Sequence, residues 1–423
     1  MADDAGFSTI SISSRRGPYE EEREVERHGF FMVFLATLVL VVVLVIAVAV
    51  PMSLSSDDEH GSDKPPAFDS PLARAKYLQQ HSPLVDGHND LPWALRQMLN
   101  NNLTAINLDQ VQSDLMTDLP RLREGLVGAQ FWSVYVTCGQ EAYNGSRAVQ
   151  ATMEQIDVVY RLIERYPKDL KLALTANDLV EGFKEGKIAS LIGMEGGHSI
   201  NNSLSTLRMF HRLGARYMTL TWACTLDWVD SANGPFLHNG LTAFGEEVVR
   251  EMNRLGMLVD ISHVSPAVMH AAINVSAAPI IFSHSNARAL CDHIRNVPDD
   301  VLDRIPANGG MVMVVFYPEF VRLENPRNVT IKDVVNHIDY IKNRIGVDHV
   351  GLGSDFDGVS YMPTDLGNVS RFVDITIELI DRGYTDEEIK KVLGLNTIRV
   401  MRQAEAVAAR LQKTTRPSDA VCC

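Results

Sequence analysis

The sequence predicts an α/β protein, a (β/α)8 TIM barrel that follows a single membrane-spanning helix. Three observations support this fold class. Short apolar runs alternate with longer amphipathic stretches, residues 30–50 form one long apolar run, and ionisable residues stand where several of the short runs end. Short apolar runs are typical of strands buried on both faces, and their alternation with helices predicts a parallel sheet.

The apolar run at residues 30–50 predicts a transmembrane helix. It contains no charged residue, and at about 1.5 Å per residue it can cross a hydrocarbon core of about 30 Å. A cleaved signal peptide is the alternative, because Ala47 and Ala49 form a small-residue cleavage pattern. We expect an uncleaved signal anchor, since the polar stretch before the run is long and the run exceeds the usual core of a signal peptide.

The basic residues near this run lie mainly on its N-terminal side. The tail of residues 1–29 contains four arginines, whereas the stalk of residues 51–70 has no basic residue before Lys64. An excess of Lys and Arg marks the cytoplasmic side of a span. The pattern therefore predicts a single-pass type II membrane protein with a disordered cytoplasmic tail, a disordered stalk and an extracellular or lumenal domain.

Cysteines and glycosylation sequons fit a domain on the secretory route. Five cysteines are few for a disulfide scaffold but permit one or two bridges in an oxidising compartment. For the terminal pair Cys422 and Cys423 we expect an interchain disulfide or no role. The Asn-x-Ser/Thr sequons predict N-glycosylation at Asn102, Asn144, Asn201, Asn274, Asn328 and Asn368.

The folded domain is expected over residues 71–405, followed by a C-terminal tail at residues 406–423. Apolar runs predict eight strands, at residues 82–90, 130–136, 189–197, 217–222, 257–264, 279–285, 310–317 and 349–358. Apolar residues spaced by three and four predict helices at residues 146–166, 204–214, 244–256, 330–346 and 369–383. Eight such units close most naturally as a TIM barrel, whose active site lies at the carboxyl ends of its strands.

Ionisable side chains stand at the ends of five expected strands. Three of them alternate within residues 82–90, so a strand would direct them to one face. A lone histidine or carboxylate at a strand end usually forms a loop hydrogen bond, but a barrel brings all strand ends to one mouth. Buried charges there are costly unless they are paired or bind a metal. The residues are Asp86, His88, Asp90, Glu195, His263, His284 and Asp355.

This set of side chains favours a hydrolytic metal centre. Three imidazoles and several carboxylates without a thiolate suit zinc or a similar divalent ion. One carboxylate could bridge two ions about 3.5 to 4 Å apart, which would provide a hydroxide nucleophile together with a Lewis acid.

Seven segments, in this order, resemble the membrane dipeptidase family: VDGHNDLPW (85–93), QFWSVYV (130–136), SLIGMEGGHSI (190–200), DISHVS (260–265), FSHSNA (282–287), RNVPDD (295–300) and GSDFDGV (353–359). The resemblance extends from residue 72 to residue 405. It implies a TIM barrel that hydrolyses dipeptides, contains two Zn²⁺ ions per subunit and forms a homodimer, with Cys422 or Cys423 as a candidate bridge.

The resemblance also implies the metal ligands. His88, Asp90 and Glu195 would bind one zinc ion, and Glu195, His263 and His284 would bind the other. Glu195 would therefore bridge the two ions.

Two further residues are implied to act on the substrate. Asp355 would be the acid/base that contacts the bridging hydroxide, although either Asp355 or Asp357 could instead cap the following loop. Arg295 would bind the free carboxylate of the dipeptide, because a guanidinium binds carboxylate bidentately; the alternative is a surface position. For His198 we expect a structural role.

The cysteines match the family only in part. Cys138 and Cys224 match a pair that is bridged in the family. Cys291 matches one member of a second pair whose partner position, near Leu323, holds no cysteine. We therefore expect Cys291 to be free.

The sequence departs from the family at two positions that would contact the substrate. Trp222 occupies the position of a histidine that stabilises the developing oxyanion, and an indole N–H cannot carry positive charge. Losing an oxyanion donor typically costs about 100- to 1,000-fold in turnover. Phe320 replaces a tyrosine after the seventh strand.

The composition and these two departures limit the classes of function that the chain can have. A net charge of −14 and a pI near 5.4 argue against a nucleic-acid partner, because binding a phosphate backbone requires a basic surface. The leading hypothesis is a zinc dipeptidase. The alternatives are a catalytically impaired binding or adhesion protein, indicated by Trp222, and a deaminase or lactonase, which would not need the carboxylate ligand Arg295.

Overall fold

The computed structural model describes residues 68–422. The predicted tail, the predicted anchor at residues 30–50 and most of the predicted stalk lie outside these residues. Within residues 68–422, no helix has both the length and the apolar composition needed to cross a bilayer. The anchor therefore stays a prediction.

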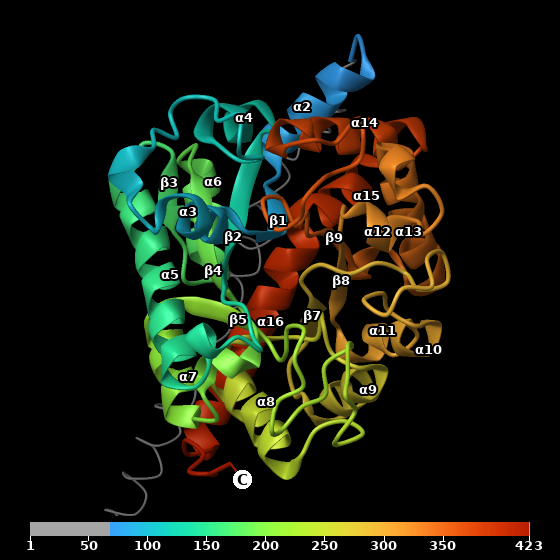
Figure 1. Ribbon diagram of the computed structural model, residues 1–423. Coiled ribbons are helices and arrows are strands. Elements are labelled where there is room, and N and C mark those ends of the chain that lie inside the picture. The colour runs from blue at the N-terminus through green and yellow to red at the C-terminus, as the bar shows by residue number, and fades with distance from the viewer. Residues whose placement is uncertain (1–67, 423) are drawn as a thin grey trace, which may run out of the picture. The chain divides into compact units, whose positions relative to one another are not determined.

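Eight parallel strands form a closed barrel, as predicted (Figure 1). They are β1 (Leu84–Asn89), β2 (Val127–Tyr135), β4 (Ile188–Glu195), β5 (Ala215–Thr219), β6 (Leu258–Asp260), β7 (Ile280–Phe282), β8 (Met311–Val314) and β9 (Val350–Leu352). The ring closes because β1 pairs with both β2 and β9, and β2 pairs with β4. The short strand β3 (Leu170–Leu172) was not predicted and pairs with the first residues of β4.

Helices surround the barrel (Figure 1). All five predicted helices are present, as α5 (Ser146–Arg165), α7 (Leu204–Arg212), α8 (Ala243–Leu255), α13 (Ile331–Ile345) and α14 (Phe372–Asp381). The remaining α-helices are α2 (Pro71–His81), α3 (Leu91–Leu99), α4 (Leu119–Glu124), α6 (Ala176–Lys184), α9 (Pro266–Val275), α10 (Asp299–Leu302), α11 (Ile305–Asn308), α12 (Pro318–Val321), α15 (Asp386–Lys390) and α16 (Asn396–Thr414). Side-chain caps define several helix starts; at α13, Thr330 and Asp333 form a reciprocal capping box.

The helix α16 continues past residue 405, where the sequence placed the end of the domain. Its residue Met401 packs in one buried cluster with Leu258 and Met311, the first residues of β6 and β8. Farther along, Ala408 is buried and Gln412 donates a hydrogen bond to the carbonyl of Arg254. The helix thus covers the amino-terminal end of the barrel, and this tertiary packing carries the folded domain beyond the expected boundary.

The sequon asparagines lie at the surface of the domain. Asn102, Asn144, Asn201, Asn274 and Asn328 are exposed, and Asn368 is half-buried. Asn368 accepts a hydrogen bond from the backbone N–H of Ser370. Glycosylation itself stays a prediction.

Candidate metal centre

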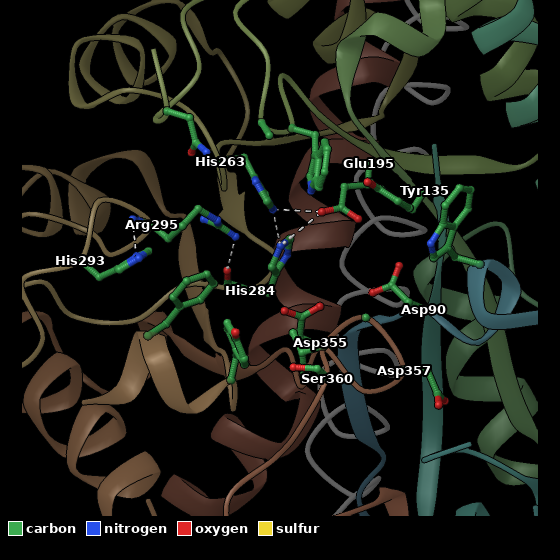
Figure 2. A pocket seen from close by; sticks show the side chains of 18 of the residues that line it. Asp90, Tyr135, Glu195, His263, His284, His293, Arg295, Asp355, Asp357 and Ser360 are labelled. Carbon is green, nitrogen blue, oxygen red and sulfur yellow. Dashed lines mark hydrogen bonds and ion pairs between the residues drawn. The ribbon is translucent and has the colours of Figure 1, made fainter. Parts of the chain in front are cut away.

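Side chains predicted from five strand ends meet at the carboxyl-terminal mouth of the barrel, where Figure 2 shows Asp90, Glu195, His263, His284 and Asp355 around one cavity. Glu195 is the last residue of β4, and the remaining residues lie in β1 or in the loops that follow β1, β6, β7 and β9. The cavity there has a volume of about 600 Å³. Its walls include Asp90, Glu195, His263, His284, Arg295 and Asp355.

Glu195 lies at the centre of this group. Its Oε1 is 3.0 Å from Nε2 of His263 and 3.6 Å from Nε2 of His284. Its Oε2 is 3.3 Å from Nε2 of His88 and accepts a hydrogen bond from Ser133. Burial alone would raise the pKa of Glu195, but the charge of His88 and the hydrogen bond with His263 hold it well below its ordinary value. The carboxylate is therefore ionised and presents one oxygen to each side.

His263 and His284 direct their Nε2 atoms to the same point, 2.9 Å apart. Burial and the positive charge of Arg295 lower the pKa of His263 to about 4. Burial, then the charges of His88 and Arg295, lowers the pKa of His284 well below its ordinary value. Both rings are therefore neutral at pH 7, which is the form that binds a metal.

A second group of donors contains His88 and Asp90. Nε2 of His88 lies 3.3 Å from Oδ2 of Asp90. Nε2 of His88 and Oδ1 of Asp90 are buried and lack a hydrogen-bond partner among the described residues. Buried polar atoms without partners are rare and costly. A cation at this point would satisfy both atoms.

The donors form two overlapping sets that fit divalent cations. One set is His88, Glu195 and His284, and the other is His88, Asp90 and Asp355; the candidate ligand atoms within each set lie within 4.8 Å of one another. Imidazole and carboxylate donors without a thiolate suit zinc and similar ions. The residues therefore fit the expected metal, while the ion's identity and number stay predictions.

Asp355 and His263 adopt unusual backbone conformations. Their φ angles are 69° and 65°, a region that costs residues other than glycine some strain and that recurs at functional sites. The N–H of Asp355 donates a hydrogen bond to the carbonyl of His88, which fixes the loop against β1. Burial raises the pKa of Asp355 well above its ordinary value; His88 opposes this shift, and the negative charges of Asp90 and Glu195 add to it.

Asp357 lies apart from the donor sets. Its Oδ1 accepts a hydrogen bond of 2.6 Å from the backbone N–H of Met116. Asp357 thus holds the loop at Met116, whereas Asp355 faces Asp90 and His88. His198 is also outside the donor sets, and its Nε2 donates to the carbonyl of Val136.

Arg295 is a buried cation at the edge of the same cavity. It is 4% exposed, and its Nη2 donates to the carbonyl of His284 at 3.2 Å. Its Nε lacks a hydrogen-bond partner in the described structure. The guanidinium lies 5.3 Å from the ring centre of Phe320. Figure 2 shows Arg295 and Asp90 on opposite sides of His284 and Asp355.

Aromatic side chains form another part of the cavity wall. Trp222 lies in edge-to-face contact with Tyr135, with ring centres 4.9 Å apart, and Tyr135 contacts Trp93 at 4.7 Å. The ring of Trp222 is 6.4 Å from that of His263. An indole therefore occupies the wall beside a candidate ligand.

The predicted disulfide between Cys138 and Cys224 is present. It joins the loops that follow β2 and β5, close to Trp222. Cys291 is buried and free, as expected.

The hydrogen bonds that orient the candidate ligands were not identified from the sequence. Nδ1 of His284 is 2.7 Å from Oγ of Ser283, which donates to Asp260. Nδ1 of His88 is 2.9 Å from the hydroxyl of Tyr217. The sequence does contain a signal for these partners, because a polar residue within a buried apolar strand needs a hydrogen-bond partner.

Asp86 behaves differently from the two residues with which it alternates. Its carboxylate accepts hydrogen bonds from Ser354 and Gln130, and it belongs to neither donor set. Burial raises its pKa to about 6, against the effect of these hydrogen bonds. Asp86 thus ties β1 to the loop after β9, so strand alternation alone overstated its link to His88 and Asp90.

Comparison with known proteins identifies relatives over most of the chain. The sequence profile of the family described as membrane dipeptidase (peptidase family M19) matches residues 72–415. The dipeptidase verJ of Clonostachys rogersoniana is 43% identical over 356 residues, which cover 82% of this chain and 90% of that protein.

Two solved structures have the same fold. The probable dipeptidase PvdM from Pseudomonas aeruginosa matches with a TM-score of 0.74 at 22% identity, over 80% of this chain and 99% of that one. A metallo peptidase from Rhodobacter sphaeroides, liganded with a phosphinate mimic of the dipeptide L-Ala-D-Ala, matches with a TM-score of 0.70 at 26% identity, over 76% of this chain and 99% of that one.

Proposed function

The chain belongs to the membrane dipeptidase family, and on this basis we propose that it is a zinc-dependent dipeptidase whose substrates carry a free C-terminal carboxylate. The metal centre would hold two Zn²⁺ ions. His88, Asp90 and Glu195 would bind one, and Glu195, His263 and His284 the other.

The observation that carries this proposal is the unpaired guanidinium of Arg295 beside the metal centre. A buried cation is costly unless an anion accompanies it, and no carboxylate of the described residues forms an ion pair with Arg295. The α-carboxylate of a dipeptide would supply that anion. A substrate held there would extend from Arg295 across Glu195 towards Asp90.

We assign different steps of hydrolysis to different residues of the site. Bound metal ions would polarise the scissile carbonyl and lower the pKa of the attacking water. Arg295 would fix the end of the substrate, so that the peptide carbon lies over Glu195. Asp355 would take the proton from the attacking water and deliver it to the departing amine nitrogen as the C–N bond breaks.

The test is hydrolysis by the purified full-length protein. Each of several dipeptides is compared with its C-terminal amide, before chelation, after chelation and after Zn²⁺ is returned. We expect zinc-dependent release of amino acids from the dipeptides and much slower release from the amides. Absence of any metal-dependent release would remove the enzyme proposal. Equal rates for acid and amide would remove only the role of Arg295.

A binding or adhesion protein with little turnover is the second candidate, and Trp222 favours it. The indole stands 6.4 Å from His263, where the family resemblance implies an oxyanion-stabilising histidine. Such a protein would bind zinc and a dipeptide in equilibrium dialysis without hydrolysing the dipeptide.

We further propose that the domain is anchored by residues 30–50 and faces the extracellular or lumenal side. The disulfide and the exposed sequon asparagines support an oxidising, glycosylating compartment. Protease protection in sealed membranes, with and without detergent, tests the orientation. A shift in mobility after glycosidase treatment tests glycosylation.

A homodimer is proposed from the resemblance, and light scattering at several concentrations, with and without reductant, tests it.

A further inference from the structure

We propose that Tyr217 is a positioning residue of the metal centre, whose hydroxyl holds His88 in the tautomer that presents a bare Nε2 to the cation. This inference rests on the metal-dependent site proposed above. It goes beyond the ligands to a residue that contacts neither metal nor substrate.

Hydrogen-bond geometry selects the tautomer. The hydroxyl oxygen of Tyr217 lies 2.9 Å from Nδ1 of His88 and 3.2 Å from the carbonyl oxygen of Gly87. A carbonyl oxygen only accepts, so the single phenolic proton is donated to Gly87. The hydroxyl oxygen must then accept from Nδ1–H of His88. A neutral imidazole with its proton on Nδ1 carries a free lone pair on Nε2.

This contact lies at an irregularity in β1. The pairing of β1 with β2 shifts register between Asp86 and Asn89, so Gly87 and His88 lie between the paired residues. Such irregularities re-aim side chains and recur beside active sites. The hydroxyl of Tyr217 donates to the Gly87 carbonyl within this segment, and it contacts the next side chain, His88, at the same time.

The ring of Tyr217 is held independently of its hydroxyl. Tyr217 belongs to β5, which β2 and β4 separate from β1 in the barrel. Its ring lies over Gly193, where a Cβ atom would come within 2.0 Å of Cζ of Tyr217. Phe131 packs against the same ring, with ring centres 5.1 Å apart. Removing the hydroxyl therefore leaves the packing of the ring in place.

The position of His88 makes its tautomer important for the whole centre. His88 belongs to both donor sets, and its Nε2 is buried without a partner among the described residues. With the opposite tautomer, Nε2 would carry a proton and could not bind a cation. Loss of a hydrogen bond behind a metal-binding histidine typically weakens metal binding by about 10- to 100-fold.

The first experiment measures metal affinity in Tyr217→Phe. Binding of Zn²⁺ to the metal-free full-length protein is followed by competition with a chromogenic chelator, without substrate. We expect affinity about 10- to 100-fold weaker than in the wild type. Tyr166→Phe is the matched control, because Tyr166 is also buried but its hydroxyl accepts from the backbone N–H of Leu108, outside the metal centre. It should bind Zn²⁺ like the wild type.

Equal affinity of a folded Tyr217→Phe variant and the wild type would overturn the proposal. Circular dichroism and the unfolding temperature show whether the variant is folded. Because no substrate is used, the outcome does not depend on whether the protein hydrolyses dipeptides.

A second experiment needs no change at Tyr217. Long-range ¹H–¹⁵N correlation spectra of the Zn²⁺-loaded wild type report which nitrogen of each histidine carries the proton, and His88→Gln identifies the signals of His88. We expect the proton on Nδ1. A proton on Nε2 would overturn the proposal even if Tyr217→Phe failed to fold.

Discussion

The Nε2 atoms of His263 and His284 lie 2.9 Å apart in the mouth of the barrel. Both rings are neutral because burial lowers the pKa of each, to about 4 for His263. Two neutral imidazoles whose Nε2 atoms lie this close together can both present lone pairs only when a cation lies between them. Glu195, whose Oε1 is 3.0 Å from His263, adds negative charge at that point. The arrangement is suited to a cation, and the first two predictions follow from it.

Metal binding should stabilise the fold. Because a cation that binds the folded state alone adds RT ln(1 + [L]/Kd) to the free energy of unfolding, Zn²⁺ at 1,000 times its Kd should add about 4 kcal/mol. Thermal unfolding of the chelated protein with increasing Zn²⁺ measures this effect, with Mg²⁺ as the control ion. An unfolding temperature that does not change with Zn²⁺ would contradict the metal centre.

Glu195→Gln should weaken metal binding more than the loss of an orienting residue does, by more than about 100-fold. The amide removes the charge that faces His88 and His263, and its NH₂ group cannot bind a cation. Metal content by mass spectrometry and dipeptide hydrolysis should fall together. Glu185→Gln, at a half-exposed glutamate paired with Lys171, is the matched control and should leave both unchanged. Full zinc content in Glu195→Gln would exclude the bridging role.

Arg295→Gln should impair binding of the substrate carboxylate. A hydrogen bond to a charged group contributes about 1.5 to 3 kcal/mol, so kcat/KM for dipeptides should fall by about 10- to 100-fold, mainly through KM. A dipeptide amide is the control substrate, because it lacks the charge that Arg295 would bind. The amide should be hydrolysed equally by wild type and variant. An equal loss for both substrates would mean that Arg295 supports the structure of the cavity instead.

Trp222→His should raise turnover if the remainder of the site is intact. A protonated or neutral imidazole in this wall can donate to a developing oxyanion, and such a donor is worth about 100- to 1,000-fold in kcat. Steady-state kinetics with one good dipeptide substrate measures the change. Trp93→His, at the other side of Tyr135, is the control and should not raise kcat. An unchanged kcat in Trp222→His would indicate that the pocket has diverged at further positions.

His337 should make stability fall in acid, independently of the metal. Its Nδ1 accepts from the N–H of Ala287 and its Nε2 donates to the carbonyl of Val321. Burial lowers its pKa from 6.5 to about 4. Between these values the unfolded state binds the proton and the folded state does not, so stability rises with pH across this range and is lost as pH falls. The full loss is about 3 kcal/mol for this group.

Urea unfolding at several pH values checks this prediction. His337→Gln does not titrate, so its free energy of unfolding should depend less on pH between 6.5 and 4 than that of the wild type. His81→Gln, at an exposed histidine, should retain the pH dependence of the wild type. An unchanged slope in His337→Gln would assign the acid sensitivity to other groups.

The barrel could be predicted because each of its strands is buried on both faces. Such strands appear in the sequence as short apolar runs, and all eight expected runs overlap an observed strand. The strand β3 escaped detection because it has only three residues and is half-exposed in part. The end of the domain was placed too early because α16 is polar along much of its surface. Its few apolar residues are buried only because the helix packs against the amino-terminal end of the barrel.

The candidate ligands could be identified because His and Glu are conspicuous at the ends of apolar runs. Asp86 shared this signal with His88 and Asp90, yet its carboxylate is held by Ser354 and Gln130. The alternation of side chains along a strand indicates a face of the strand, but not the depth at which a side chain lies in the barrel.

Residue type and periodicity were sufficient to predict the parallel barrel and the chemical class of its centre, since both follow from local hydrophobicity and from where polar groups interrupt it. The positions of the donors relative to one another, the contact of Tyr217 with His88 and the lack of an ion pair between Arg295 and any described carboxylate arise on closure of the barrel. They depend on distances between strands that are remote in the chain, and the order of residues along each strand carries no information about those distances.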